Sequence, residues 1–499
     1  MRIVNTHECE PEDLHNHDER ESIYCGLDCC VTAEILEVLL PQLDEHTAPT
    51  YAFSRALQGP VLEMQLRGIL VDQGRRQEVI NLYTDKIDQL EGQLEQIVLD
   101  GVGMPTFSWR SNSDLQKLFF GYLGIPTIRK QGRPTTDHKA LEKMQIFLAA
   151  KPIINHLLTM RELAKKIDFL RTGVDPDGRI RTSYNISGTN TGRFSSSYSE
   201  FGTGGNLQNV EESLRSVFIS DCGWKFAKFD AKAGESYCVG AIEGNLFNDW
   251  RYLDAVESGD VHTAVARICW PGLGWTGDLR RDKAIAERPF YRHYSYRFMC
   301  KKLGHGSNYG GQPATLAMQT NLPEPVVIGF QPKYFHAFPA HLRWHEWTND
   351  QLQRVGFLIT LTGRKRWFFG RRNDPSTQRE GIAYNPQGSL ADIVNRAMLK
   401  IWRKRICLVS MQDHDALTFM YREEDEDEIV PQLQEMLMEE IPLQHGRSLS
   451  IPYDCKTGWN KGDWNAETNS DGLKDYEGHD ERRRQPKVSV IHRLLHRKH

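Results

Sequence analysis

The chain has 499 residues, of which 39% are hydrophobic and 26% are charged, and its formal net charge is −4. This composition favours a soluble globular protein of several domains, and without an uninterrupted run of about 18 apolar residues it argues against a membrane protein. The charge gives no global basic field, although a nearly neutral chain can carry a local basic groove for nucleic acid.

Processing signals and disulfide frameworks are not evident either. The first 20 residues are polar and lack the apolar core of a secretory signal. The ten cysteines show no recurring CxxC pair at zinc-finger spacing. We therefore expect reduced thiols in a cytosolic compartment rather than a metal site.

The N-terminal third of the chain is predicted to be helical. Residues 24–43 form an amphipathic pattern that stops at Pro41, and residues 83–102 carry apolar residues at helical spacing before Gly101. Ser111 and Asn112 give a capping signal for a helix over 111–125, and a basic Gly-Pro turn at 129–134 leads into another capped helix. The long charged helix at 83–102 suits a projecting arm.

From about residue 180 the pattern becomes rich in β-strands. Strands are expected near 179–188, 216–220 and 224–230, with a long polar loop over 189–210 that suggests function because structureless loops of about 20 residues are unusual. Helices are expected over 285–310, 343–355 and 388–407, and hairpins over 357–369 and 406–421.

Two aspartates follow strand-like segments. The strand at 224–229 runs into Asp230, and the strand at 406–411 reaches Gln412, Asp413, His414 and Asp415. Each carboxylate alone is more simply a solvated strand end or turn. Together, at the ends of neighbouring strands, Asp230 and Asp415 would hold two divalent cations about 3.5–4 Å apart, an arrangement suited to in-line displacement at phosphorus. Mg²⁺ fits such a site because it prefers carboxylates, substrate phosphates and water.

A helical stripe carries cations followed by rings. Arg297, Lys301, His305 and Tyr309 recur every four residues, so on a helix they form one slowly drifting stripe. Its order suits a nucleoside triphosphate lying along the helix, with phosphates on the cations and base and sugar on the rings. An ordinary solvent-facing basic stripe is the alternative, and the glycines after His305 and Tyr309 favour the first interpretation by thinning the helix for a base pair.

These pieces, in this order, resemble the DNA polymerase I family, family A. Its first motif is similar to Asp230 and Glu235, its second to the stripe with Gly306 and Gly310, and its third to His414 and Asp415. Further segments resemble its TGR-SS…NLQN loop (191–209), its D-I-H segment (260–262), its Q-G-x-x-A-D-I helix (387–393) and a thumb segment (107–127). The resemblance covers roughly residues 20–465.

The resemblance implies an α+β right-hand fold, in which a palm with an antiparallel sheet carries helical fingers and a helical thumb. The expected divisions are an exonuclease remnant (1–50), the thumb and connecting helices (51–180), a first palm segment (181–260), the fingers (261–370), a second palm segment (371–465) and a basic C-terminal tail (466–499), whose last 19 residues hold seven Lys/Arg and one acid.

The resemblance also implies roles for matching residues. Asp230 and Asp415, with the carbonyl of Ala231, would bind two Mg²⁺ ions, for which Mn²⁺ can substitute. Nucleotide-binding residues would be Arg297, Lys301, His305, Tyr309, Glu235 and His262, with Lys301 also the acid for pyrophosphate departure and Glu235 and Tyr309 excluding a 2′-hydroxyl. DNA-binding residues would be Arg193, Arg379, Gln387, His414, Asn206 and Gln208; minor-groove contacts check geometry without reading sequence.

The chain departs from the family pattern at several positions. Ala231-Lys232 replaces Tyr-Ser, Tyr237 replaces Arg, and His305 replaces another aromatic residue. Ala416 stands where the family has Glu, and Asp413 replaces an apolar residue. Asp413 is therefore either a relocated carboxylate or neutral drift.

The expected function is template-directed addition of dNTPs to a primer 3′-OH, with primer–template DNA and dNTPs as partners and no membrane. Tyr24 and Asp28 match only the last motif of the family's 3′–5′ exonuclease domain, which predicts no proofreading by this chain alone and an exonuclease or other replication protein in trans. The phrase FGTGGNLQNV (201–210) and the compact thumb suggest a viral or phage branch, and the resemblance implies the cytoplasm of a bacterium or a phage-infected host. The alternatives are a single-subunit RNA polymerase, which Glu235 argues against, and a non-catalytic nucleic-acid-binding relic.

Overall fold

A computed structural model describes residues 17–199, 202–292 and 294–477. Its centre is an antiparallel five-stranded sheet in the order β13-β14-β8-β17-β18. The strands are β8 (Trp224–Ala231), β13 (Leu408–Asp413), β14 (Ala416–Arg422), β17 (Tyr453–Gly458) and β18 (Lys474–Asp475). The strands expected near 224–230 and 406–421 are therefore confirmed. The expected tail began at 466, but Lys474–Asp475 belongs to the sheet, and residues 478–499 lie outside the described residues.

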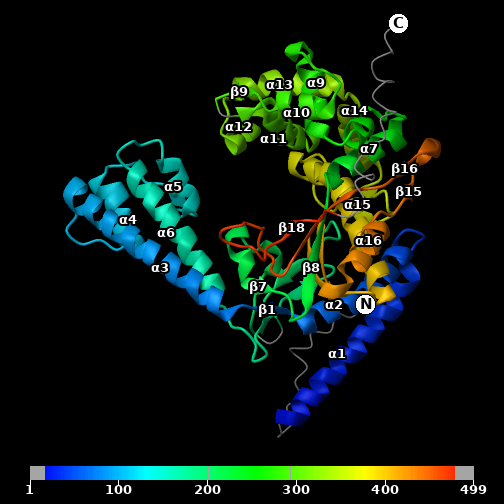
Figure 1. Cartoon of the computed structure of the whole chain (residues 1–499), viewed down its shortest axis with the longest axis horizontal. Coiled ribbons are helices and arrows are strands. Elements are labelled where there is room, and N and C mark those ends of the chain that lie inside the picture. Colours follow the sequence, from blue (N-terminus) through cyan, green and yellow to red (C-terminus); the bar gives the residue numbers. More distant parts are fainter. Residues whose placement is uncertain (1–16, 200–201, 293, 478–499) are drawn as a thin grey trace.

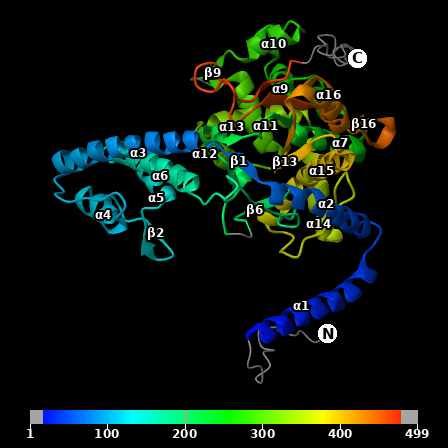
Figure 2. The ribbon, with the colours of Figure 1, turned by 60° about the horizontal axis from the view of Figure 1, so that its bottom comes forward.

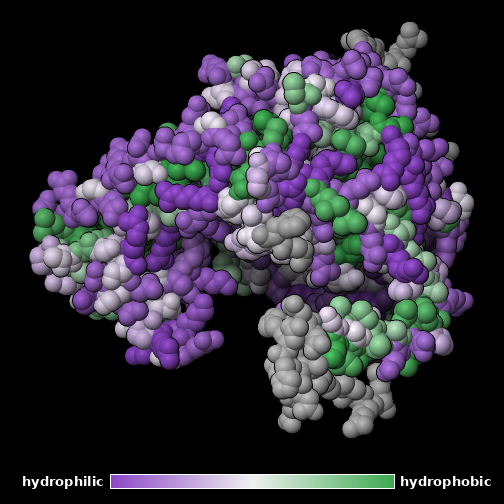
Figure 3. Space-filling view, turned by 90° about the horizontal axis from the view of Figure 1, so that it is seen from below, coloured by the Kyte–Doolittle hydropathy of each residue, from purple (hydrophilic) through white to green (hydrophobic). Residues whose placement is uncertain are grey.

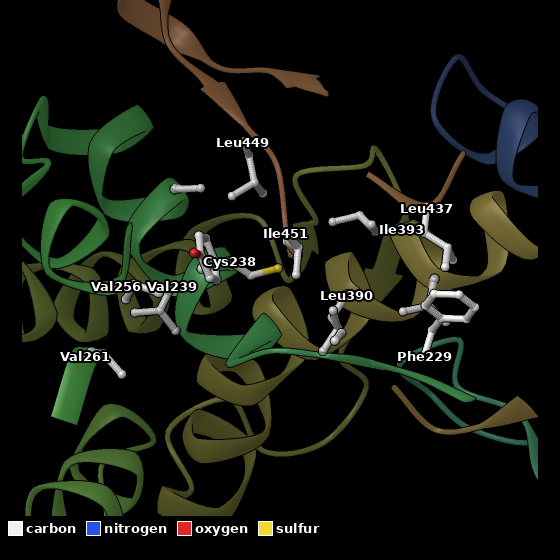
Figure 4. Close-up of a cluster of buried hydrophobic side chains, with 14 of the residues drawn as sticks. Phe229, Cys238, Val239, Val256, Val261, Leu390, Ile393, Leu437, Leu449 and Ile451 are labelled. Carbon is white, nitrogen blue, oxygen red and sulfur yellow. The ribbon is translucent and has the colours of Figure 1, made fainter. Parts of the chain in front are cut away.

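The residues of β8 alternate between a buried face and an open face. Ala227, Phe229 and Ala231 are buried, whereas Lys228 and Asp230 on the other face are partly exposed or exposed, as expected for a strand with a period of two. The buried face packs against α15 (Pro375–Lys404) and α16 (Glu426–Leu437) and continues into α7 (Gly234–Phe247). Figure 4 shows Phe229, Leu390 and Leu437 facing one another in this core.

A group of helices stands above the sheet (Figure 1). It comprises α8 (Arg251–Glu257), α9 (Val261–Cys269), α10 (Leu279–Ala286), α11 (Tyr296–Asn308), α12 (Pro313–Thr320), α13 (Glu324–Ala337) and α14 (Ala340–Arg354). The helix expected over 285–310 is wrong at its start, because the hairpin β9 (Pro289–Tyr291) and β10 (Tyr294–Ser295) precedes α11. Pro289 lacks the N–H that a helix needs, Arg292 has a φ of 53°, and the Ser295 hydroxyl caps α11 by accepting the Phe298 N–H.

A helical arm projects to one side of the sheet (Figures 1 and 2). It consists of α3 (Gln73–Gln96), α4 (Asn112–Gln116), β2 (Arg129–Lys130), β3 (Arg133–Pro134), α5 (His138–Met144) and α6 (Lys151–Leu170), with π-helical turns at Ile97–Val102 and Lys117–Tyr122. The arm helix begins ten residues before the expected start at 83, since the Asp72 side chain accepts the Arg75 N–H as an N-cap. The expected Ser111 cap is present.

A small sheet in the order β4-β1-β7 connects the arm to the centre. Its strands are β1 (Ile69–Val71), β4 (Arg179–Ile180) and β7 (Phe218–Ile219). The polar loop expected over 189–210 is partly ordered, because β6 (Ser195–Ser197) pairs with β5 (Ser183–Asn185) and Leu207–Asn209 forms a 3₁₀ turn. The expected hairpin at 357–369 is present as β11 (Phe357–Ile359) and β12 (Lys365–Trp367), and β15 (Ile441–Pro442) pairs with β16 (Ser448–Leu449).

The N-terminal helices differ in their surroundings. α2 (Thr47–Arg67) packs on α15 and β13, whereas α1 (His17–Leu39) projects away from the body, followed by a 3₁₀ turn at Leu40–Gln42 that contains Pro41 (Figure 2). Hydrophobic side chains of α1 are exposed, among them Ile35, Leu36, Val38 and Leu39. In Figure 3 hydrophobic side chains gather on the lobe at the bottom of the view, while the arm is mostly hydrophilic.

Candidate active site

The two predicted aspartates lie close together where β8 ends and β14 begins, in the middle of the central sheet. Asp230 is the penultimate residue of β8 and lies opposite Ala416 of β14, and the backbone N–H of Ala231 donates to the Asp415 carbonyl over 3.1 Å. Partial burial and the neighbouring Asp415 carboxylate raise the pKa of Asp230. The fold therefore concentrates negative charge where the sequence predicted a metal site.

A pocket of about 190 Å³ lies beside these carboxylates. Lys228 lies in it with its Nζ 3.7 Å from Asp230 Oδ2, and Arg215 contributes a second cation. The pocket is lined by Leu207, Gln208, Val210, Arg215, Phe218, Lys228, Asp230, Met411, Asp413, His414, Asp415, Ala416 and Lys461. It combines anionic and cationic groups, as a site for a metal-bound phosphate requires.

Asp413 is engaged by a lysine that the sequence analysis did not single out. Lys461 is only 6% exposed, and its Nζ lies 3.0 Å from Asp413 Oδ2 and 2.6 Å from Met411 Sδ. Burial lowers the pKa of Lys461, an effect that Asp413 opposes. One oxygen of Asp413 thus forms an ion pair with a buried lysine, while its Oδ1 is buried and has no hydrogen-bond partner within the described part of the chain.

The turn between β13 and β14 is held by a chain of side-chain hydrogen bonds. His414 adopts a φ of 61°, a left-handed conformation that costs a non-glycine residue free energy unless its surroundings hold it. Gln208 donates to Gln412 Oε1 over 2.8 Å, and Gln412 donates to the His414 carbonyl over 2.9 Å. Gln208, predicted to contact DNA, is buried in this chain of hydrogen bonds. Gln412 was missed, although a glutamine ending an apolar strand was a usable signal.

Glu235 joins the sheet region to α11. It lies in the first turn of α7 and forms an ion pair with Arg193, and the Tyr309 hydroxyl donates to its second oxygen. Burial and Glu235 together raise the pKa of Tyr309. The predicted sugar-contacting pair is therefore in direct contact, and Arg193, predicted to contact the minor groove, is part of the same cluster.

A second ion pair supports the loop of Arg193. Gly192 has a φ of +79°, and a Cβ there would lie 2.7 Å from the Arg364 guanidinium carbon. Arg364 follows β11 and donates to Asp392 of α15 over 2.6 Å. Sequence reasoning missed both residues, because 28 positions separate them and no local pattern links a hairpin arginine to a helix aspartate.

Within the described residues, the cations of the predicted triphosphate stripe differ in whether they form ion pairs. Arg297 Nε lies 2.8 Å from Asp260 Oδ2, and a second contact of 3.4 Å joins it to Glu287. Lys301 and His305 are exposed, and the rings of His305 and Tyr309 contact edge to face at 5.2 Å.

His262 lies beside this stripe. Burial lowers the pKa of its imidazole to about 4; Asp260 opposes this change, and Arg297 and Lys301 add to it. The structure thus brings His262 together with both predicted phosphate-binding cations.

The structure explains Gly306 and Gly310, at the end of α11 and just after it, by packing and chain direction. A Cβ on Gly306 would lie 2.3 Å from Leu316 Cδ2, so the residue permits close packing on α12. Gly310 follows the end of the helix with a φ of +68°. The interpretation that these glycines thin the helix for a base pair is therefore replaced by packing and chain reversal.

The remaining predicted DNA-binding residues lie at exposed or half-buried positions. Asn206 is exposed and accepts a hydrogen bond of 2.6 Å from Ser196, and His414 Nε2 lies 3.4 Å from Asn209 Oδ1. Arg379 is exposed near the start of α15, and Gln387 is half-buried further along it. Their contact with DNA stays a prediction.

Most of the sequence matches a known family. The model of DNA polymerase family A matches residues 77–466. The chain belongs to DNA polymerase family A. It is 26% identical over 459 residues to the thermostable DNA polymerase I of Thermus filiformis, covering 87% of this chain and 50% of that protein. It is 27% identical over 467 residues to DNA polymerase I of Chloroflexus aurantiacus, covering 87% and 45%.

This family A chain spans about half the length of the curated relatives it matches. Its fold is similar to that of the POL domain of Pol1 from M. smegmatis, solved in complex with a DNA primer-template and dNTP, with a TM-score of 0.64, 23% identity, and coverage of 81% of this chain and 69% of that one. The predicted α+β right-hand fold is confirmed.

Members of family A use divalent metal ions, and the site fits such an ion. Among the described residues, Asp415 forms no ion pair within 4 Å, and the one ion-pair partner of Asp230 is Lys228, at 3.7 Å. Within those residues no group of three or more His, Cys, Asp or Glu side chains is arranged to hold a metal ion by itself. An ion bound by these carboxylates would complete its shell with substrate oxygens and water, as Mg²⁺ commonly does.

The structure also bears on membrane-spanning helices and on the state of the cysteines. Across residues 17–199, 202–292 and 294–477, no helix is both long and apolar enough to span a membrane. The nine cysteines in these ranges are free thiols.

Proposed function

We propose that the chain is a template-directed DNA polymerase that adds dNTPs to a primer 3′-OH. The observation that carries the proposal is the meeting of Asp230 and Asp415 at the end of β8, beside a pocket that also contains Lys228. Two Mg²⁺ ions at this site would stabilise the charge that develops on the attacking and leaving oxygens. Family membership supports the proposal.

The chain's own residues would position the substrates. Arg297, Lys301 and His262 would bind the triphosphate, and Lys301 would donate the proton to departing pyrophosphate. Exposed Lys301 is available for this role, whereas Arg297 must exchange Asp260 and Glu287 for phosphate oxygens. Such an exchange is favourable because a phosphate accepts a bidentate guanidinium at least as well as a carboxylate does.

The divisions of the hand are part of the proposal. The arm of α3–α6 would be the thumb, the five-stranded sheet with α15 the palm, and α9–α14 the fingers. The extended α1 would correspond to the exonuclease remnant, which contains Tyr24 and Asp28 of the last exonuclease motif. Primer–template DNA and dNTPs would be the partners, in the bacterial or phage-infected cytoplasm.

The decisive test is the substitution Asp415→Asn. It keeps the volume of the side chain and removes one of the two metal-binding charges, so primer extension should be lost while the affinity for primer–template DNA is retained. Extension of a labelled primer and a DNA-binding titration measure the two properties. The matched control is Asp475→Asn on β18, which removes an exposed aspartate from the same sheet and should leave extension unchanged. Extension by the Asp415→Asn protein at the wild-type rate would refute the metal assignment.

A further inference from the structure

Four neighbouring strands place one residue each in a row across the open face of the central sheet. Asp413 lies opposite Ala416, Ala416 opposite Asp230, and Asp230 opposite Asp454. Residues directly opposite one another in antiparallel strands point to the same face. Asp454, on β17, was not among the residues singled out from the sequence, because only the register brings it beside Asp230.

The register also gives the spacing. The Lys232 N–H donates to the Pro452 carbonyl over 2.9 Å, which makes Ala231 and Tyr453 a non-hydrogen-bonded pair. Asp230 and Asp454 are then the adjacent hydrogen-bonded pair, whose Cα atoms are typically about 5.5 Å apart. The carboxylates of Asp230 and Asp454 are therefore neighbours on one face of the sheet, without direct contact between them being required.

The other acidic member of the row is already engaged. Asp413 forms the buried ion pair with Lys461, and Ala416 stands where the family resemblance leads us to expect a glutamate. Asp454 is 66% exposed, and its one ion-pair partner among the described residues is Lys232, at 4.0 Å and 50% exposed. Since exposed pairs at this distance contribute little, the Asp454 carboxylate is available.

We propose that Asp454 is the third carboxylate of the metal site and accepts hydrogen bonds from the hydration shell of a divalent cation held by Asp230. This inference rests on the proposed function, because that function supplies the cation. Mg²⁺ keeps several waters when few carboxylates bind it, and groups that orient such ligands strongly affect metal affinity. Asp454 is thus a positioning residue that takes the place of the missing carboxylate at 416.

The test is the affinity for Mn²⁺ in the absence of DNA and nucleotide, measured by calorimetry and by electron paramagnetic resonance of free Mn²⁺. Asp454→Asn should raise the Kd for Mn²⁺ by about tenfold. Asp454→Glu, which keeps the charge, should stay close to wild type, and so should the control Asp475→Asn. An unchanged Kd in Asp454→Asn, or no Mn²⁺ site in the wild-type protein, overturns the proposal.

Lys232→Gln separates this role from a simple surface ion pair. Loss of the lysine removes a competing cation, so Mn²⁺ should bind at least as tightly as in the wild type. If Lys232→Gln weakens Mn²⁺ binding as much as Asp454→Asn does, the Lys232–Asp454 pair is what matters, and the proposal is wrong.

Failure of this inference differs from failure of the proposed function. If the proposed function is wrong, the wild-type protein binds Mn²⁺ but does not extend a primer. If only the role of Asp454 is wrong, the protein extends a primer with the same Mn²⁺ dependence before and after Asp454→Asn.

Discussion

Glu235 is the residue on which the proposed nucleotide-binding end of the site depends. Its two carboxylate oxygens are divided between Arg193 and the Tyr309 hydroxyl. Because both partners are partly buried, removing the carboxylate would leave a guanidinium and a hydroxyl without their acceptor, which costs more than the bond itself is worth. The position of the Tyr309 ring therefore depends on Glu235.

We expect Glu235→Ala to weaken the discrimination against ribonucleotides. The ratio of kcat/KM for dNTP over rNTP should fall by about 10- to 100-fold, or about 1.4–2.7 kcal/mol, since the ring and carboxylate that would exclude a 2′-hydroxyl are released together. Single-nucleotide incorporation with matched dNTP and rNTP measures the ratio. The control Glu257→Ala removes a carboxylate of α8 that pairs with Arg447 and should leave the ratio unchanged; an equal effect of both substitutions would contradict the assignment.

At the residue scale, the sequence predicted those functional side chains that have a recognisable local sequence pattern. Asp230 was identified because an apolar strand leads into it, Asp415 because it lies in a polar turn between two apolar strands, and Ser111 because capping has a local signature. Asp454 and Lys461 were missed because their neighbours are set by strand pairing over long distances in the chain. A polar residue in a strand carries no mark of what lies opposite it.

At the scale of elements, α11 is fixed against α12 by a close approach. Gly306 allows this approach. The sequence does not reveal which helix packs against Gly306, so it could not distinguish this role from the expected one of admitting a base pair. The hairpin of β9 and β10 was missed because apolar spacing continues through it, although α10 ends at Ala286 and β9 begins at Pro289, which lacks the backbone N–H that a helix needs.

Gly306→Ala should destabilise the protein although alanine favours helices. The added Cβ would lie 2.3 Å from a methyl carbon of buried Leu316, and overpacking of this kind costs about 1–3 kcal/mol, more than the gain of about 1 kcal/mol in helix propensity. Thermal unfolding should show a lower Tm, and Leu316→Ala in the same protein should recover part of the loss.

The matched control is Gly92→Ala in α3, where a Cβ would meet nothing within 4 Å. This substitution should raise the Tm. A rise in both variants would show that the contact with Leu316 relaxes without cost.

At the scale of the whole molecule, two hydrophobic clusters share the central sheet. One contains Phe229 and Leu303 and extends into the upper helices, and the other contains Phe226 and Leu94 and extends into the arm. The right-hand architecture was predictable because ordered motifs identify it. The division of β8 between two cores was not, since it depends on which face each residue presents.

We expect the two clusters to open independently. Leu94→Ala, at a fully buried position, should cost about 2–5 kcal/mol and increase amide hydrogen exchange in α3 and α6. Leu303→Ala, also fully buried, should increase exchange in α11 and α13 instead. Mass spectrometry of the exchanged protein resolves these regions. If either substitution raised exchange in both, the sheet would transmit unfolding and the molecule would be one cooperative unit.

The support of Arg193 runs from Asp392 through Arg364, under Gly192, to Glu235 and Tyr309. These residues come from five separate stretches of the chain, yet each limits what its neighbour can become. A side chain at 192 would displace the arginine beneath it, and loss of the acid at 392 would strand a buried charge. We therefore expect substitutions at these positions to be correlated among related sequences, because a change at one of them alters the packing or the charge balance of the next.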